Sequence, residues 1–121
     1  MNKAAEHVVL DGGEAFTSQA VAMNGDNFVQ IEAWLVSATA AATGAGGLKM
    51  TIDRSNDLNT WESDPFGILS FGSGSVAPEY KKEPTSGTPT YARYVRLRVE
   101  NLETSIRFMF NANLTTFQLS I

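Results

Sequence analysis

Few side chains in this sequence are able to carry catalysis. Histidine occurs once, at His7, and cysteine is absent. A Ser-His-Asp triad, a thiolate nucleophile or a two-histidine zinc site would therefore each lack a group that its chemistry requires. The glycine-rich run 44–47 has neither the lysine nor the helix of a phosphate-binding loop. We expect no enzyme activity, no catalytic residue and no cofactor.

Carboxylates are the next candidates, since paired acids hydrolyse glycosides and bind calcium. Four of them share one short window: Asp53, Asp57, Glu62 and Asp64. The run 53–57 lacks the later glycine and glutamate of an EF-hand loop. A calcium site made by Asp57 and neighbouring carbonyl groups stays open, but the pattern favours a turn in which Asn56 and Asp57 bond to their own backbone. We expect no metal ion.

Basic residues gather in the last third of the chain, at Arg93, Arg96, Arg98 and Arg107. A stripe made by Arg96 and Arg98 could contact phosphates, but the net charge is −4 and the isoelectric point about 4.8. Proteins that hold nucleic acid through its phosphates usually present a basic face. We therefore favour ion pairs with Glu100, Glu103 or carboxylates on neighbouring strands, and we expect no nucleic-acid partner.

The elements that must position these side chains are strands, because apolar and polar residues alternate with period two. The clear runs are 28–36, 48–54, 93–100 and 106–112, and the weaker ones are 6–10, 20–23, 67–71 and 117–121. We expect 28–36 and 48–54 to be neighbours, and 106–112 to be the antiparallel partner of 93–100. The apolar parity slips by one before Phe117, which predicts a bulge or turn within 111–116.

No apolar repeat of helical spacing accompanies these runs. About eight short strands with turn residues between them predict an all-β, antiparallel β-sandwich, with jelly-roll winding favoured. A length of 121 residues suits one domain, covering residues 1–121. Residues 1–7 contain no apolar leader segment and no later stretch has the length of a membrane span, so we expect no membrane partner.

Two connections are longer than is usual in small domains. The first, 38–47, consists of small residues and is expected to be flexible; the second, 72–90, is rich in proline, glycine and serine. We interpret 72–90 either as a disordered excursion or as an arm that orders against a partner. Trp34 shares a mixed strand face with Gln30 and Glu32, so it either anchors an interface or lies beneath a loop.

Two stretches resemble known families. The run 51–61 (TIDRSNDLNTW) is similar to a strand, Ser-Asn-Asp turn and tryptophan segment of β-sandwich proteins, and 91–99 (YARYVRLRV) is similar to a strand of the same proteins. Discoidin-type carbohydrate- and lipid-binding domains share this pair, as do small jelly-roll virion proteins of tailed bacteriophages, including capsid decoration (cement) proteins. The short length, the missing cysteine pair and secretion signal, and the initial methionine favour the phage proteins.

That resemblance implies a non-enzymatic virion structural protein, most plausibly a capsid decoration protein that stabilises the shell. It would form a dimer or trimer and contact the major capsid protein or another virion protein. It would be made in the cytoplasm of a bacterial host and reside in the virion. The residues expected at the interface are Trp34, Val76, Pro78, Tyr80, Lys81 and Lys82.

Two alternatives remain open. One is a discoidin-like carbohydrate-binding module, in which Trp61 and Tyr80 stack on sugar rings while Asn56 and Asp57 hydrogen-bond to hydroxyl groups. The other is a component of a phage tail or fibre.

Overall fold

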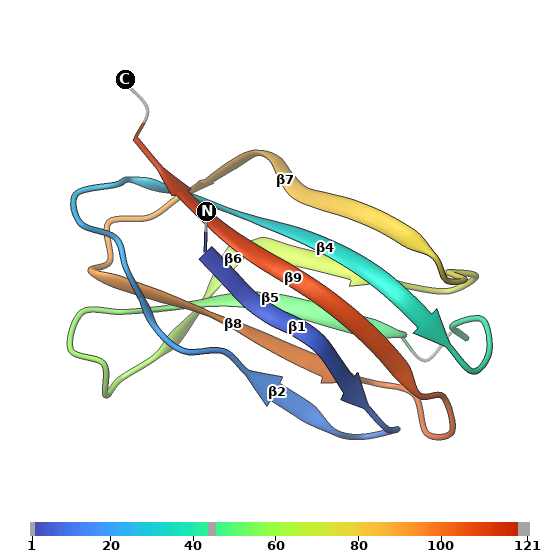
Figure 1. Ribbon diagram of the computed structural model, residues 1–121. Helices are drawn as coiled ribbons and strands as arrows, with labels where there is room; N and C mark the ends of the chain where they lie inside the picture. The colour runs from blue at the N-terminus through green and yellow to red at the C-terminus, as the bar shows by residue number, and fades with distance from the viewer. Residues whose placement is uncertain (1, 44–45, 119–121) are drawn as a thin grey trace.

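The computed structural model describes residues 2–43 and 46–118, and within these ranges the chain forms nine strands and no helix. Two antiparallel sheets lie face to face as two layers (Figure 1). The strands are β1 (Asn2–Leu10), β2 (Ala15–Thr17), β3 (Val21–Ala22), β4 (Phe28–Ala38), β5 (Leu48–Ser55), β6 (Glu62–Phe71), β7 (Glu79–Pro89), β8 (Tyr94–Asn101) and β9 (Phe108–Phe117).

The order of the strands is that of a jelly roll. One sheet has the order β1-β9-β4-β7 and the other β2-β8-β5-β6, with β3 also paired to β8. Because β2 and β3 both pair with β8, they act as one strand interrupted near Ser18, and the eight resulting strands are divided four and four between two sheets in jelly-roll order. The predicted fold, a jelly-roll β-sandwich of about eight strands, is confirmed.

The core lies between the two sheets and is built by the alternation seen in the sequence. Every second residue is buried along β8, from Val29 to Leu35 of β4 and from Phe108 to Leu114 of β9. Each large apolar side chain buried in this way contributes about 1.5–3 kcal/mol relative to an exposed one. The other residues of these strands face outward, which fixes the chemistry of the two outer faces.

The expected strand partners were wrong in two places. Strands β4 and β5 belong to opposite sheets, and so do β8 and β9, which do not form a hairpin. Strand β4 pairs with β7 and β9, whereas β5 pairs with β6 and β8. Alternation shows that one face of a strand is buried, but both sheets of a sandwich bury one face, so the pattern does not reveal which sheet a strand joins.

The bulge expected within 111–116 was also wrong. In this section β9 pairs with β4 without a shift in register, and Leu114 continues the buried parity of the strand. Phe117 has the opposite parity because it lies on the outer face, where its ring stacks on Phe28 with centroids 5.8 Å apart. The irregularities lie in β1 instead. Residues 119–121 of the last predicted strand are outside the described part of the chain.

The segment 72–90 is not an arm. Its first part is a turn, and residues 79–89 form β7, an edge strand antiparallel to β4. An edge strand with one wet face needs few apolar residues, and it tolerates proline because its outer N–H groups have no ladder partner. The polar composition that predicted a loop is therefore the composition of a sheet edge.

The loop at 38–47 starts later than expected, since β4 extends to Ala38, and its described part is held in place. Ala42 is buried and exchanges backbone hydrogen bonds with Ser75 and Gly74. Thr43 donates its amide and its hydroxyl to the buried carboxylate of Glu103. These contacts correct the prediction of a flexible loop for residues 42 and 43.

Candidate binding groove on the outer face of the first sheet

An aromatic pair lies on the outer face of the β1-β9-β4-β7 sheet. The alternation of β4 directs Trp34 outward, and the register of β7 places Tyr80 directly opposite. Their ring centroids are 5.3 Å apart and the rings are inclined by 45°. Tyr80 is 48% exposed. Aromatic surface that stays exposed on a sheet face is a common anchor for a ligand or partner.

The pair lies in a groove of about 620 Å³ that crosses four strands. It is lined by Lys3, Ala5, Glu6, Trp34, Leu35, Val36, Pro78, Glu79, Tyr80, Asn111 and Asn113. Tyr80, Trp34 and Asn111 form one row, because Trp34 is the register partner of both other residues. An apolar floor with a few convergent polar groups is the usual composition of a small-molecule site.

Hydrogen bonds and ion pairs set the electrostatics of the groove. The hydroxyl of Tyr80 donates to Oε2 of Glu32 at 2.5 Å, and this bond to the carboxylate raises the pKa of Tyr80. Among the residues that line the groove, Lys3 pairs with Glu6 at 3.3 Å. Glu79 also lines it and lies 3.9 Å from the ammonium of Lys81, which does not. The lysine that lines the groove, Lys3, therefore already has a carboxylate partner, an arrangement that suits a neutral ligand better than an anionic one.

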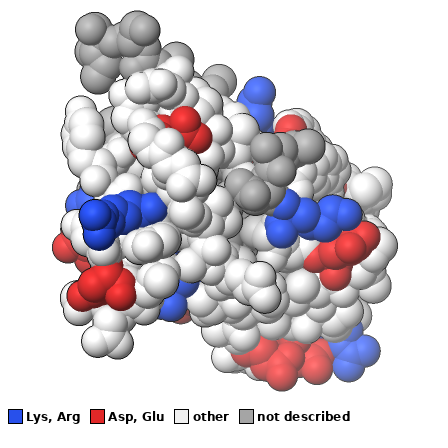
Figure 2. Space-filling model, turned by 60° about the vertical axis from the view of Figure 1, so that its left-hand side comes forward, with Lys and Arg blue, Asp and Glu red and all other residues white. Residues whose placement is uncertain are grey.

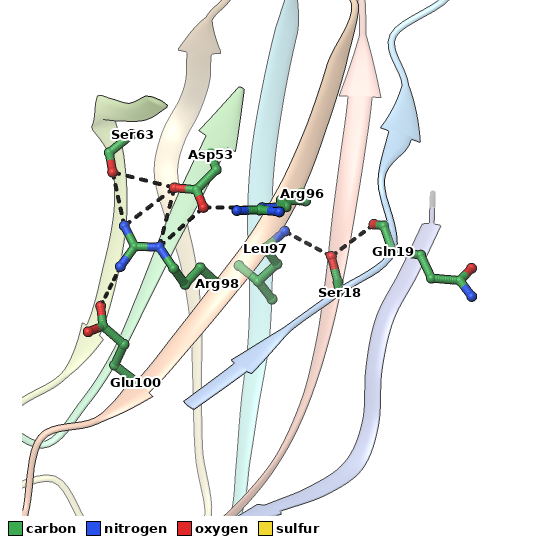
Figure 3. A network of polar contacts seen from close by, with 8 residues as sticks. All are labelled: Ser18, Gln19, Asp53, Ser63, Arg96, Leu97, Arg98 and Glu100. Carbon is green, nitrogen blue, oxygen red and sulfur yellow. Dashed lines mark hydrogen bonds and ion pairs between the residues drawn. The ribbon is translucent and has the colours of Figure 1, made fainter. Parts of the chain in front are cut away.

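The surface has no large region of one sign in the view that Figure 2 shows, where basic and acidic groups alternate over the molecule. On the outer face of the second sheet the same mixing is resolved in detail (Figure 3). Asp53, 3% exposed, accepts hydrogen bonds from the guanidinium groups of Arg96 at 3.3 Å and Arg98 at 3.1 Å. Arg98 also donates to Glu100 at 2.7 Å, and the bond to Asp53 raises the pKa of Arg98.

The ion pairing predicted for Arg96 and Arg98 is thus confirmed: Asp53 is their partner on the neighbouring strand β5, and Glu100 is a partner of Arg98 on β8 itself. Glu103 is not one of them, since its carboxylate binds Thr43. Two arginines already engaged by carboxylates make a poor site for phosphate, because a phosphate would have to displace those partners.

The residues predicted for a protein interface are brought together in part. Trp34, Pro78 and Tyr80 line the groove, and Val76, just before it, is 56% exposed. Lys81 turns away and donates to the carbonyl of Ser70 at 2.7 Å, whereas the neighbouring Lys82 is exposed. Whether these side chains contact a protein partner stays a prediction.

The residues predicted for glycan contacts do not form one site with Tyr80. Trp61 precedes β6 of the second sheet, whereas Tyr80 is on β7 of the first. The guanidinium of Arg96 lies 4.2 Å from the centroid of the Trp61 ring, so it occupies the space in which a sugar would stack on that face. A cation this close to an indole is an attractive contact in its own right.

Asp57 bonds to the backbone of its own turn, as one of the two interpretations predicted, whereas Asn56 does not and instead joins the turn to a distant part of the chain. Asp57 accepts hydrogen bonds from the amides of Thr60 at 2.8 Å and Asn59 at 2.9 Å. These amides, together with the hydroxyl of Ser55, lower the pKa of Asp57. Asn56 accepts a hydrogen bond from the amide of Arg93 at 3.0 Å. Within the described residues, no group of three or more histidine or acidic side chains could hold a metal ion.

Sequence reasoning missed Asn111 and Asn113 as site residues. The available signal was that they alternate along the strand with buried apolar residues such as Phe110 and Ala112, so that both must point to the outer face. What the sequence did not reveal is that β9 lies beside β4, so that these amides adjoin Trp34.

Comparisons with known proteins do not show a family. No family model and no curated protein matches the chain. Among solved structures, the C-terminal domain of a chitobiase from Bacteroides fragilis is 17% identical over 87% of this chain, with a TM-score of 0.46. This chain spans 66% of that domain. The structure of TmCBM61 in complex with β-1,4-galactotriose is 13% identical over 91% of this chain and 70% of that one, with a TM-score of 0.42. Similarity at this level carries no functional inference.

No helix long and apolar enough to cross a membrane occurs in the part of the chain that the structure describes.

Proposed function

We propose that this chain is a non-catalytic binding module that takes a neutral saccharide in the Trp34–Tyr80 groove. The observation that carries the proposal is the row of Tyr80, Trp34 and Asn111 across three strands, in which a half-buried Trp34 and an exposed Tyr80 lie beside an amide. A sugar ring has an apolar face of C–H groups and a rim of hydroxyl groups. It therefore needs an aromatic surface together with hydrogen-bonding groups at the side, which this row supplies.

Charge supports the choice of ligand. Lys3, the lysine among the lining residues, is already paired with Glu6, so a sulfated or phosphorylated sugar would find no unpaired cation there. Neutral hydroxyl groups, in contrast, both donate and accept, and they match a site of amides, a carboxylate and a phenol.

The test is a glycan array followed by calorimetry with Trp34→Ala and Tyr80→Ala. Each substitution is expected to weaken binding about tenfold or more, equivalent to about 1.4 kcal/mol. Trp61→Ala is the matched control, because it removes an equally large aromatic side chain from the other sheet. An array without signals, or an equal loss with Trp61→Ala, would refute the proposal.

The virion structural protein expected from the sequence is the second candidate, and one observation favours it. Three apolar or aromatic side chains stay exposed around the groove: Val36 at 38%, Tyr80 at 48% and Val76 at 56%. Such side chains can form the centre of an interface between copies, as a dimer or trimer, or with another protein of a phage head or tail.

Sedimentation equilibrium of the wild type and of Val76→Glu tests this candidate. Assembly would be seen as a mass above 13.1 kDa that returns to the monomer value in the variant, whereas the glycan affinity of the monomer would be unchanged. A monomer at all concentrations that also fails to bind a capsid or tail assembly would exclude it.

A further inference from the structure

A backbone bulge in β1 points one amide of that strand at the groove. Between Ala5 and Val8 the chain of β1 advances three residues while β9 advances two, from Ala112 to Phe110. The extra step is taken with a left-handed backbone at His7, whose φ is +48°. As a result, the N–H of His7 donates to the side chain of Asn111, with the amide nitrogen 2.6 Å from Oδ1.

This bond fixes which end of the Asn111 side chain is the acceptor. A backbone N–H can only donate, so the atom that it contacts must be the carbonyl oxygen. The NH₂ group of Asn111 is then the end left for a ligand, and it has no hydrogen-bond partner among the residues that the structure describes. Because Asn111 lines the groove beside Trp34, that side of the groove offers a donor.

The opposite side has the reverse polarity. The hydroxyl proton of Tyr80 is donated to Glu32, so the phenol oxygen of Tyr80, which lines the groove, can only accept a hydrogen bond from a ligand. The aromatic surface of Trp34 therefore lies between a donor, the Asn111 amide on β9, and an acceptor, the Tyr80 oxygen on β7.

We infer that Asn111 is a specificity-determining residue and that the bulge at His7 sets its direction, an inference that rests on the saccharide-binding function proposed above. The ligand group next to β9 must accept a hydrogen bond, as a neutral hydroxyl or ring oxygen does. An ammonium group only donates, so an amino sugar placed there would leave its own protons and those of Asn111 facing each other.

The experiment uses two β-1,4-linked tetrasaccharides that differ at C2: cellotetraose, with a hydroxyl group, and the tetramer of glucosamine, with an ammonium group. Calorimetry at about pH 6 keeps the amine protonated and an aspartate ionised. We expect the wild type to bind cellotetraose at least tenfold more tightly. Asn111→Asp, which keeps an acceptor for the His7 N–H but replaces the donor by oxygen, is expected to reverse this preference.

Asn113→Asp is the matched control, because it adds the same charge to the same groove two residues along β9. It is expected to change the ratio of the two affinities less than threefold. Equal changes in both variants would mean that added charge, rather than the directed donor, decides the preference, and the inference would be overturned.

A measurement without ligand tests whether the His7 amide is bonded to the Asn111 side chain, as the inference requires. Hydrogen exchange of the His7 amide is expected to be at least tenfold faster in Asn111→Ala and nearly unchanged in Asn111→Asp. Exchange unaffected by either variant would overturn the role of the bulge. If the wild type binds neither tetrasaccharide, the inferred specificity is wrong, and the glycan array then decides separately whether the groove binds saccharides at all.

Discussion

The side chain of Asn101 is expected to be one of the largest polar contributors to stability in this chain. It lies at the end of β8, is 2% exposed, and joins three separate parts of the backbone. Its NH₂ group donates to the carbonyls of Leu10 at 3.0 Å and Ile106 at 2.7 Å, and its oxygen accepts from the amide of Glu103 at 3.0 Å. Asn101→Ala removes all three bonds.

The expected loss follows from these contacts. A buried hydrogen bond contributes about 1 kcal/mol net, and a buried group left without a partner costs about 1–3 kcal/mol. Three bonds therefore predict a decrease of about 3 kcal/mol in the free energy of unfolding, or on the order of 10 °C in Tm for a domain of this size. Asn101→Asp keeps the acceptor but turns a carboxylate toward two carbonyl oxygens, so we expect it to be at least as destabilising near neutral pH.

Urea unfolding followed by tryptophan fluorescence measures both variants. Asn59→Ala, an exposed asparagine in a turn, is the control and should change stability by less than about 0.5 kcal/mol. A loss below about 1 kcal/mol in Asn101→Ala, or one equal to that of the control, would show that water replaces the three bonds and that the reasoning is wrong.

Three further predictions concern the backbone and one carboxylate. His7→Gly should stabilise the fold by about 0.5–1 kcal/mol, since glycine adopts the φ of +48° without strain; a destabilised variant in urea unfolding would contradict this. Gly47→Ala should destabilise by at least about 2 kcal/mol, because a Cβ would lie 1.9 Å from the carbonyl oxygen of Phe71, and a normal Tm would refute it. The hydroxyl and then the amide of Thr43 lower the pKa of Glu103 below its usual 4.5. The stabilisation that this gives is present above about pH 4.5 and is lost as the pH falls through the lowered pKa. Glu103→Gln should make the free energy of unfolding depend less on pH in this range. An unchanged loss of stability at acid pH would exclude Glu103 as its cause.

The sequence predicted the strands and their buried faces better than it predicted their partners. The alternation in β4, β8 and β9 reflects burial of one face, a local property that neighbouring residues show. Sheet membership depends on where loops such as 39–47 and 102–107 carry the chain, and the residues of a loop crossing between sheets resemble those of a hairpin. Strand β7 was missed because an edge strand does not need an alternation of apolar residues, and its sequence is mostly polar.

The same distinction between local pattern and strand pairing applies to the candidate site. The outward direction of Trp34 follows from parity alone and was predicted. Its contact with Tyr80 required β7, and the place of Asn111 required both the pairing of β9 with β4 and the bulge in β1. Trp61 was misplaced as a stacking surface because no sequence pattern shows that Arg96, on a neighbouring strand, lies over its ring.

The irregular edges of the two sheets have a consequence for how copies of this molecule can associate. Strand β1 carries the bulge at His7, β2 and β3 are separated at Ser18, and the pairings of β7 and β6 both shift register. All four edges of the described sheets are thus interrupted, so none offers a long straight template on which another copy could extend a fibril. We therefore expect the chain to resist cross-β growth at high local concentration and to meet its partners through side chains on the faces of its sheets.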